Sequence, residues 1–310
     1  MKRKYNIPLF TILLIGWLQH FTHAQVNKLM EAFDCYQNKN FTCAKNKIDS
    51  VVLHPETKEE PAAWSLRAYI YYQYFKMYEY KLYNSPYREI SAESAQKSQS
   101  LSPDAETENN NKRLLKTIAE SYFNQIKIYL YDSLSYTKSV ELYNNYKKLY
   151  QTIDPSFNFK DKDVEFYNSV GGQFVTTIKK LFDSNTPISE TTFNEYNESA
   201  KVSFNKVLEI DPNNSAALEG LAIAYYNQGT MLIKEMSYDT PIEQIEQIQE
   251  NANKYFKQAL PYMQKAYSNK PNDINIITGL AGIYYAIHDN EKYIEFKKIL
   301  DKLNKEKQQK

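Results

Sequence analysis

One pattern of bulky, small and aromatic positions recurs along the chain. A bulky or apolar residue is followed three positions on by a second, then directly by a small residue, and three positions later by an aromatic one. The copies are Trp64, Arg67, Ala68, Tyr71; Leu115, Ile118, Ala119, Tyr122; Tyr167, Val170, Gly171, Phe174; Leu218, Leu221, Ala222, Tyr225; Ile277, Leu280, Ala281, Tyr284; and a fainter Lys28, Glu31, Ala32, Cys35. Residues with this spacing share one face of a helix, and the small residue lets a second helix approach closely. Six copies predict a stack of helical hairpins.

Proline supplies a second periodicity. Five of the eleven prolines stand where a hairpin should close: Pro55, Pro103, Pro155, Pro212 and Pro271. Proline cannot continue a helix and biases the residue before it toward extended geometry. The distance from the small residue to the closing proline grows along the chain, so we expect lengthened helices. Three Ser/Thr-Pro pairs predict fresh helix starts inside the longer units: Ser85-Pro86, Thr186-Pro187 and Thr240-Pro241.

These motifs resemble the tetratricopeptide repeat, a helix-turn-helix unit of about 34 residues that ends in proline. Its second helix is matched by Ala200, Phe204, Val207, Pro212 and by Ala259, Met263, Ala266, Pro271. The resemblance implies an all-α fold, an α-solenoid of about six antiparallel helical hairpins wound into a right-handed superhelix. We expect a single domain over residues 25–310, with hairpins at roughly 25–55, 60–103, 110–155, 160–212, 215–271 and 273–305.

The first 24 residues have the pattern of a signal peptide. Lys2, Arg3 and Lys4 precede an apolar run from about Ile7 to Leu18, and cleavage after Ala24 would release the mature chain. The alternative is an uncleaved membrane anchor, although the run is short for a span of about 20 residues. We expect an exported protein, periplasmic or associated with the outer membrane, whose mature chain has no transmembrane span.

Charge and motif content exclude several function classes. Without the leader, 35 Lys and Arg residues stand against 37 Asp and Glu, and they are interspersed, which argues against a nucleic-acid partner. His54 and His288 belong to no recognisable set of catalytic residues. Gly171-Gly172 is not a phosphate-binding loop, because it lies inside a helical pattern, where close helix packing explains it. We therefore expect no enzyme activity, no cofactor and no metal site.

The two cysteines, Cys35 and Cys43, lie symmetrically about a short turn between two helices. In an oxidising compartment this placement favours a disulfide. The alternative is a pair of buried thiols.

Tyrosine is unusually frequent, with 28 copies, and the position after the motif's aromatic residue is usually aromatic as well. In the tetratricopeptide family that position of the first helix faces the concave groove. The resemblance therefore implies a ladder of partner-binding rings at this position, formed by Tyr36, Tyr72, Phe123, Tyr226 and Tyr285, and Tyr69 extends that face along the first helix of the second unit. Tyrosine offers contact area with one hydrogen-bonding tip, which suits peptide or glycan recognition. The alternative is that long helices bury more tyrosine between layers.

From these observations we expect a protein-protein interaction scaffold of the bacterial cell envelope that binds a peptide or protein segment in this groove. A glycan-binding module that uses the same tyrosines is the alternative function.

Overall fold

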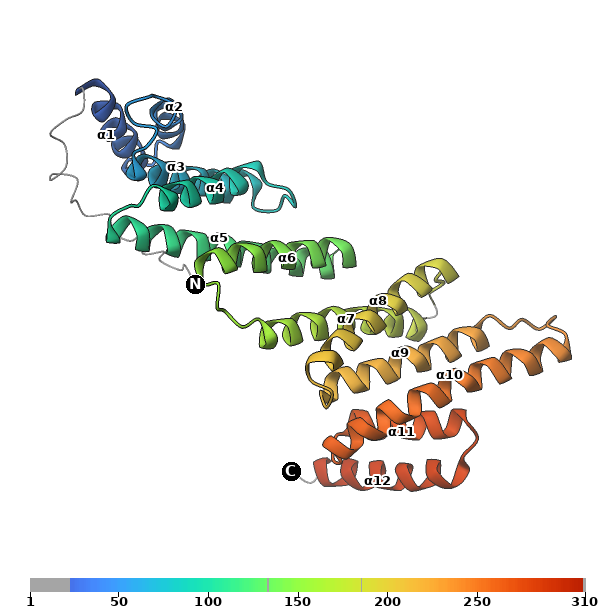
Figure 1. Cartoon of the computed structure of the whole chain (residues 1–310). Coiled ribbons are helices and arrows are strands. Elements are labelled where there is room, and N and C mark those ends of the chain that lie inside the picture. Colours follow the sequence, from blue (N-terminus) through green and yellow to red (C-terminus); the bar gives the residue numbers. More distant parts are fainter. Residues whose placement is uncertain (1–22, 133, 185, 309–310) are drawn as a thin grey trace. The chain divides into compact units, whose positions relative to one another are not determined.

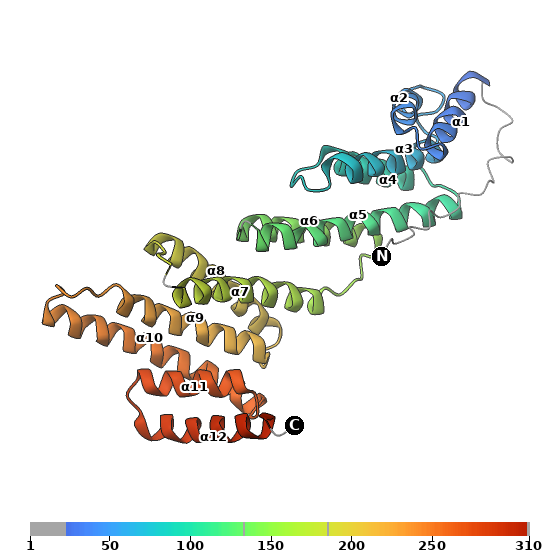
Figure 2. The same ribbon diagram turned by 180° about the vertical axis from the view of Figure 1, so that it is seen from behind.

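The computed structural model describes residues 23–132, 134–184 and 186–308, and every regular element in these ranges is helical. The α-helices follow one another in antiparallel pairs (Figures 1 and 2). Their bounds are α1 His23–Gln37, α2 Phe41–Val51, α3 Pro61–Tyr74, α4 Pro86–Ser100, α5 Ala105–Tyr131, α6 Tyr136–Ile153, α7 Lys160–Asp183, α8 Glu190–Ile210, α9 Ser215–Lys234, α10 Ile242–Asn269, α11 Ile274–Ala286 and α12 Asn290–Gln308. A π-helical segment, η1 Phe75–Glu79, continues α3. The predicted all-α fold of helical hairpins is confirmed.

Residues 1–22, which hold nearly all of the predicted leader, lie outside the described residues. The leader stays a prediction.

None of the described helices combines the length and the apolar character that crossing a membrane requires.

The helices form two compact units. Unit 1 comprises residues 1–126 and 141–156, and unit 2 comprises residues 127–140 and 157–310. In unit 1, the fully buried Ala32, Ala44 and Ile48 belong to a core that α1, α2 and α3 share. In unit 2, a core of buried residues joins α9, α10, α11 and α12. The single solenoid domain expected over residues 25–310 stays a prediction.

The helices end where the closing prolines predict. The observed last residues are Val51, Ser100, Ile153, Ile210 and Asn269, each two to four positions before Pro55, Pro103, Pro155, Pro212 and Pro271. The rigid proline ring and its missing N–H stop each helix there.

The Ser/Thr-Pro pairs are a less reliable signal. Ser85 caps α4, since its Oγ accepts from the Arg88 N–H at 3.1 Å and Pro86 is the first helical residue. The start predicted at Thr186-Pro187 is wrong, because α8 begins at Glu190 and is capped by Ser189. The Thr240 cap is also wrong: α10 begins at Ile242, and the Thr240 hydroxyl instead accepts from the Ser237 N–H at 2.9 Å within the preceding turn.

The small residue of the repeated pattern is buried in all six copies. Ala32, Ala68, Ala119 and Ala222 have no exposed surface, Ala281 is 7% exposed and Gly171 is buried too. Each lies where a neighbouring helix needs room. In five of the copies the spacing identified the packing face of the first helix correctly, whereas in the first copy Lys28 and Glu31 are exposed and only Ala32 is buried.

In unit 2, one phenylalanine ring fits between two glycines. Phe204 of α8 is 2% exposed. A Cβ atom added to Gly171 of α7 would lie 2.7 Å from this ring, and one added to Gly220 of α9 would lie 2.1 Å from it. Because glycines flank the ring on both helices, it has little room to move away from either. The contact holds three consecutive helices together.

In unit 1, the buried Arg88 of α4 anchors the extended end of the second hairpin. Its guanidinium donates to the Tyr83 carbonyl and to Gln125 Oε1 of α5, both at 2.8 Å, and lies 3.7 Å from the centre of the Tyr122 ring. Gln125 in turn donates to the carbonyls of Tyr80 and Leu82. An aromatic face and amide oxygens thus stabilise this cation in the interior.

We expect Gly220→Ala to lower the free energy of unfolding by about 1–3 kcal/mol, because the added methyl group overpacks the Phe204 ring. Chemical denaturation followed by circular dichroism measures this change. A second substitution, Phe204→Leu, should recover part of the loss by shortening the side chain.

Gly172→Ala is the matched control, since an added Cβ meets nothing within 4 Å there. It should be neutral or stabilise the helix by up to about 1 kcal/mol. If Gly172→Ala and Gly220→Ala lowered the free energy of unfolding equally, the tight packing of the Phe204 ring against Gly220 would be contradicted.

Candidate functional site

Three first helices of unit 1 line an apolar cleft, which we call the α1–α3 cleft. A water-sized sphere can occupy about 50 Å³ of it. Its lining residues are Leu29, Met30, Phe33 and Tyr36 of α1, Ala62, Ser65, Leu66 and Tyr69 of α3, and Thr107 of α5. The cleft therefore lies on the helix face where the sequence predicts partner binding, and it brings together two of the six predicted groove residues, Tyr36 and Tyr69.

Both tyrosines turn their hydroxyl groups to protein partners. Tyr69 Oη donates to the Asn110 carbonyl at 3.0 Å, and Tyr36 Oη accepts from Gln73 Nε2 at 3.5 Å. Burial raises the pKa of Tyr36 and raises that of Tyr69 to about 12, so both rings are neutral at physiological pH. The cleft consequently receives mainly ring carbon from them.

The other four predicted groove residues lie in different surroundings. The Phe123 ring is 5.2 Å from that of Tyr146 on α6, and Tyr226 is 5.0 Å from Phe256 on α10, so each packs within its own hairpin. Tyr72 is half-buried, with the Lys76 ammonium 5.6 Å from its ring centre. Tyr285 is 64% exposed beside Tyr293. Partner binding by these residues stays a prediction.

Two carboxylates lie at the end of the α1–α3 cleft where α3 and α5 begin. Glu60 Oε1 accepts from the Ala62 N–H at 3.4 Å, and Asp104 accepts from the Thr107 N–H and hydroxyl at 2.9 and 2.7 Å. Burial raises the pKa of Glu60, and repulsion from Asp104 acts in the same direction. The Thr107 hydrogen bonds lower the pKa of Asp104. Each carboxylate is therefore hydrogen-bonded to a residue that lines the cleft.

The sequence analysis missed one polar atom of the cleft. Ser65 is 1% exposed, and its Oγ has no hydrogen-bond partner among the described residues. Serine in a helix ordinarily bonds back to the carbonyl four residues earlier. Here that carbonyl, of Pro61, accepts instead from Ser98 Oγ at 2.7 Å. The sequence gives one indication that the Ser65 hydroxyl is buried: Ser65 stands at a core-facing position of the helical pattern.

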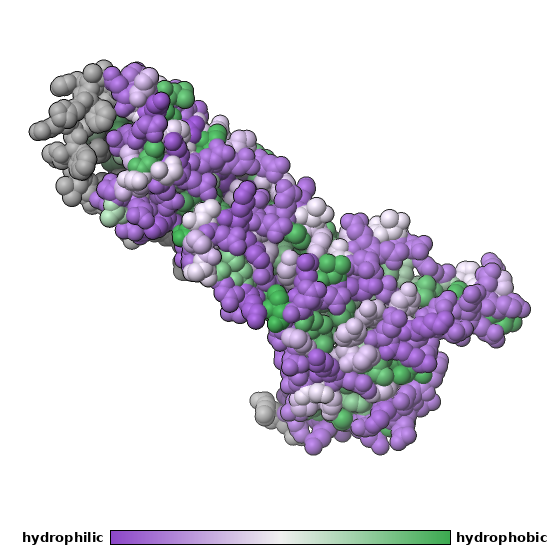
Figure 3. All heavy atoms as spheres, viewed as in Figure 1, coloured by the Kyte–Doolittle hydropathy of each residue, from purple (hydrophilic) through white to green (hydrophobic). Residues whose placement is uncertain are grey.

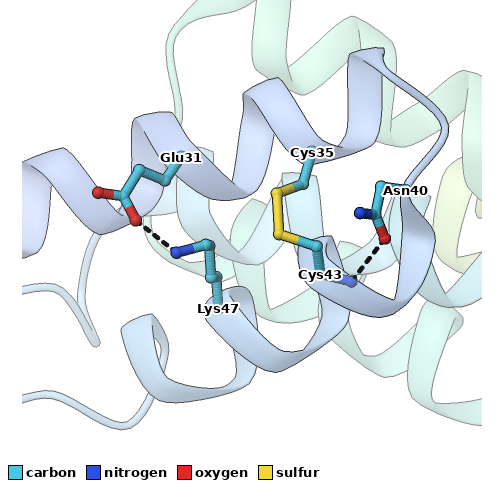
Figure 4. The surroundings of a disulfide bond; sticks show 5 residues. All are labelled: Glu31, Cys35, Asn40, Cys43 and Lys47. Atoms are coloured by element: carbon cyan, nitrogen blue, oxygen red, sulfur yellow. Dashed lines mark hydrogen bonds and ion pairs between the residues drawn. A yellow bond between two sulfur atoms is a disulfide. The ribbon is translucent and has the colours of Figure 1, made fainter.

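The predicted disulfide is confirmed. Cys35 of α1 and Cys43 of α2 form an S–S bond across the first hairpin (Figure 4). On one side of it Glu31 pairs with Lys47, and on the other Asn40 Oδ1 accepts from the Cys43 N–H at 3.1 Å. The bridge fixes α1, which supplies four residues of the cleft, to α2.

The remaining chemistry of the described part of the chain is sparse. No group of three or more His, Cys, Asp or Glu side chains there is arranged to hold a metal ion. On the face shown in Figure 3, hydrophilic side chains predominate and hydrophobic ones form small separate groups.

No family model matches the sequence, and no curated protein matches it. Solved structures do match, at low similarity. MamA (MSR-1 C2) is 11% identical with a TM-score of 0.31, covering 92% of this chain and 98% of that one. PilW, described as a widely conserved type IV pilus biogenesis factor, is 14% identical with a TM-score of 0.32, covering 89% and 91%. The TPR2AB domain of yeast Sti1, in a complex with pHSP90, is 12% identical with a TM-score of 0.28, covering 91% and 92%.

The described helices form antiparallel pairs with a buried small residue at each repeated position, which is the arrangement of a tetratricopeptide-like helical repeat.

We expect replacement of both cysteines by serine to lower the free energy of unfolding of unit 1 by roughly 2–3 kcal/mol, the chain-entropy value for so short a loop. Urea denaturation followed by the fluorescence of Trp64 measures this loss. Dithiothreitol should destabilise the native chain and leave the serine variant unchanged. Alkylation of native protein without reductant would contradict the bridge.

The raised pKa of Tyr69 predicts a pH-dependent term in stability. Its folded-state value of about 12 exceeds the ordinary value of 10. The contribution is therefore complete below pH 10 and is lost as the pH rises toward 12, because the unfolded chain ionises first. Tyr69→Phe should cost about 1 kcal/mol at pH 8 through the lost hydrogen bond to Asn110. The difference between native and variant in urea denaturation should shrink at pH 11.5, and a constant difference would contradict the assignment.

Proposed function

We propose that this protein is a non-enzymatic scaffold of the bacterial cell envelope that binds a peptide or protein segment along the face formed by its first helices. The observation that carries this proposal is the α1–α3 cleft, which is built only from first helices and lined mainly by apolar and aromatic side chains. Such a face can bind a partner without any catalytic group. Side chains of a partner can then be buried against a rigid surface.

The geometry of the cleft favours a peptide over a glycan. Sugars need several hydrogen-bonding groups, and the hydroxyls of Tyr36 and Tyr69 already bond to Gln73 and Asn110. A glycan would be served better by an exposed ring such as Tyr285, which is 64% exposed. Glycan binding is therefore the second candidate, and its place would be α11 in unit 2.

The envelope location rests on the leader-like sequence of residues 1–24 and on the disulfide. Disulfides persist in oxidising compartments, of which the bacterial periplasm is one.

Site-resolved photocrosslinking tests this function. A photoreactive amino acid is placed at Met30, Tyr72 or Tyr285 on first helices, and as a control at the exposed Glu93 on α4, a second helix. In intact native cells we expect protein adducts from the first-helix positions and none from Glu93.

Adducts from all four positions alike, or from none, would overturn the scaffold proposal. Adducts at Tyr285 alone that a glycosidase removes would favour the glycan alternative. Cell fractionation of the same samples checks the location, and a cytoplasmic pool of the crosslinked species would contradict it.

A further inference from the structure

The α1–α3 cleft carries more chemical information than an apolar surface alone. Its rim has two carboxylates, Glu60 and Asp104, and no basic side chain pairs with either among the described residues. Both carboxylates bond to residues that line the cleft, Glu60 to Ala62 and Asp104 to Thr107. Two negative charges at neighbouring helix starts repel each other, and a cation placed beside them would relieve that repulsion. The rim is thus complementary to a positively charged group.

The interior of the cleft sets a second requirement. The Tyr36 and Tyr69 rings, together with Leu29 and Leu66, present carbon surface to any occupant. Burying an aliphatic side chain there is favourable because it removes apolar surface from water.

Ser65 supplies a third, independent requirement. Its Oγ is buried and has no hydrogen-bond partner among the described residues, a state that costs free energy until a partner arrives. A peptide main chain carries both an N–H and a carbonyl at every ordinary residue, and either can bond to a hydroxyl. An extended peptide therefore satisfies an atom that a purely hydrocarbon ligand would leave unpaired.

We propose that the α1–α3 cleft binds a peptide segment in which a bulky aliphatic residue stands next to a basic one. The aliphatic side chain lies between the Tyr36 and Tyr69 rings, a main-chain group of the segment bonds to Ser65 Oγ, and the basic side chain faces Glu60 and Asp104. This inference rests on the proposed function, and it specifies the chemistry of the partner.

Fluorescence anisotropy with the full chain tests the proposal, using three fluorescein-labelled peptides in a Gly-Ser background. The first has a central leucine flanked by lysines, the second has glutamates in place of the lysines, and the third has alanine in place of the leucine. We expect the lysine-leucine peptide to bind, and each exchange to weaken binding at least about tenfold.

Two sets of variants assign the binding to the cleft. Ala62→Phe fills it and should abolish binding, while Ala216→Phe makes the same change at the same helical position of α9 and should not. Glu60→Gln combined with Asp104→Asn keeps the capping side chains polar and should remove the preference for lysine over glutamate.

Ser65→Ala separates binding from folding. Removing an unpaired buried hydroxyl should leave the free protein as stable as before or more so, yet weaken the lysine-leucine peptide several-fold. A parallel loss of stability and affinity would overturn the role of Ser65.

The remaining outcomes are distinct. Binding unaffected by Ala62→Phe, or indifferent to peptide charge, overturns the proposal. Failure of all three peptides while photocrosslinking from Met30 still captures a protein overturns the peptide chemistry and leaves the scaffold function standing. Binding that appears only after residues 1–24 are removed would assign the cleft to this chain's own leader. Self-association that Ala62→Phe abolishes would assign it to a second copy.

Discussion

Close approach of helices at one small residue per repeat is the constraint on which this fold depends. Packed helices lie about 8–10 Å apart, and the lower end of that range requires alanine or glycine at the contact. Ala68 and Ala222 have no exposed surface, and the Phe204 ring occupies the space that side chains at Gly171 and Gly220 would fill. A larger residue at such a position would separate two helices and also shift the hairpin that follows. The repeat can therefore vary freely in helix length and in surface charge, but hardly at this position.

Lengthening of the hairpins follows from this freedom, and it creates a new structural problem. Residues added beyond the small-residue contact extend past the neighbouring hairpin and need their own anchorage. In the second hairpin Arg88 provides it through the Tyr83 carbonyl and Gln125, with the Tyr122 ring against its guanidinium. Aromatic faces and fixed carbonyl dipoles both stabilise a buried cation, and Arg88 has both around its guanidinium.

The sequence was most informative where the physics is local. Helix ends were predictable because proline acts on its own backbone. The buried face was predictable for most first helices because its spacing follows the helical period, but in α1 the pattern residues Lys28 and Glu31 are exposed. Helix caps were less predictable. Ser85 caps α4 as expected, but Ser189 rather than Thr186 caps α8, and Thr240 closes a turn with Ser237 instead of capping α10, which begins at Ile242. A serine or threonine before proline can cap a helix or close a turn, and only the residues that pack around it decide between the two. The role of Arg88 and the orphan hydroxyl of Ser65 depend on residues distant in sequence, so no local pattern could reveal them.

The tyrosine surplus has a similar explanation, which also bears on the site. A tyrosine at a hairpin interface can fill space with its ring and bond its hydroxyl to a neighbouring helix, as Tyr69 does with Asn110 and Tyr71 does with Asp49. A hydroxyl used in this way has less hydrogen-bonding capacity left for a ligand. The two tyrosines therefore offer the α1–α3 cleft mainly ring carbon. The polar groups at the cleft are the Ser65 hydroxyl, which has no hydrogen-bond partner among the described residues, and the capping carboxylates of Glu60 and Asp104. Abundant tyrosine supports the scaffold here, while Ser65, Glu60 and Asp104 would distinguish one partner from another.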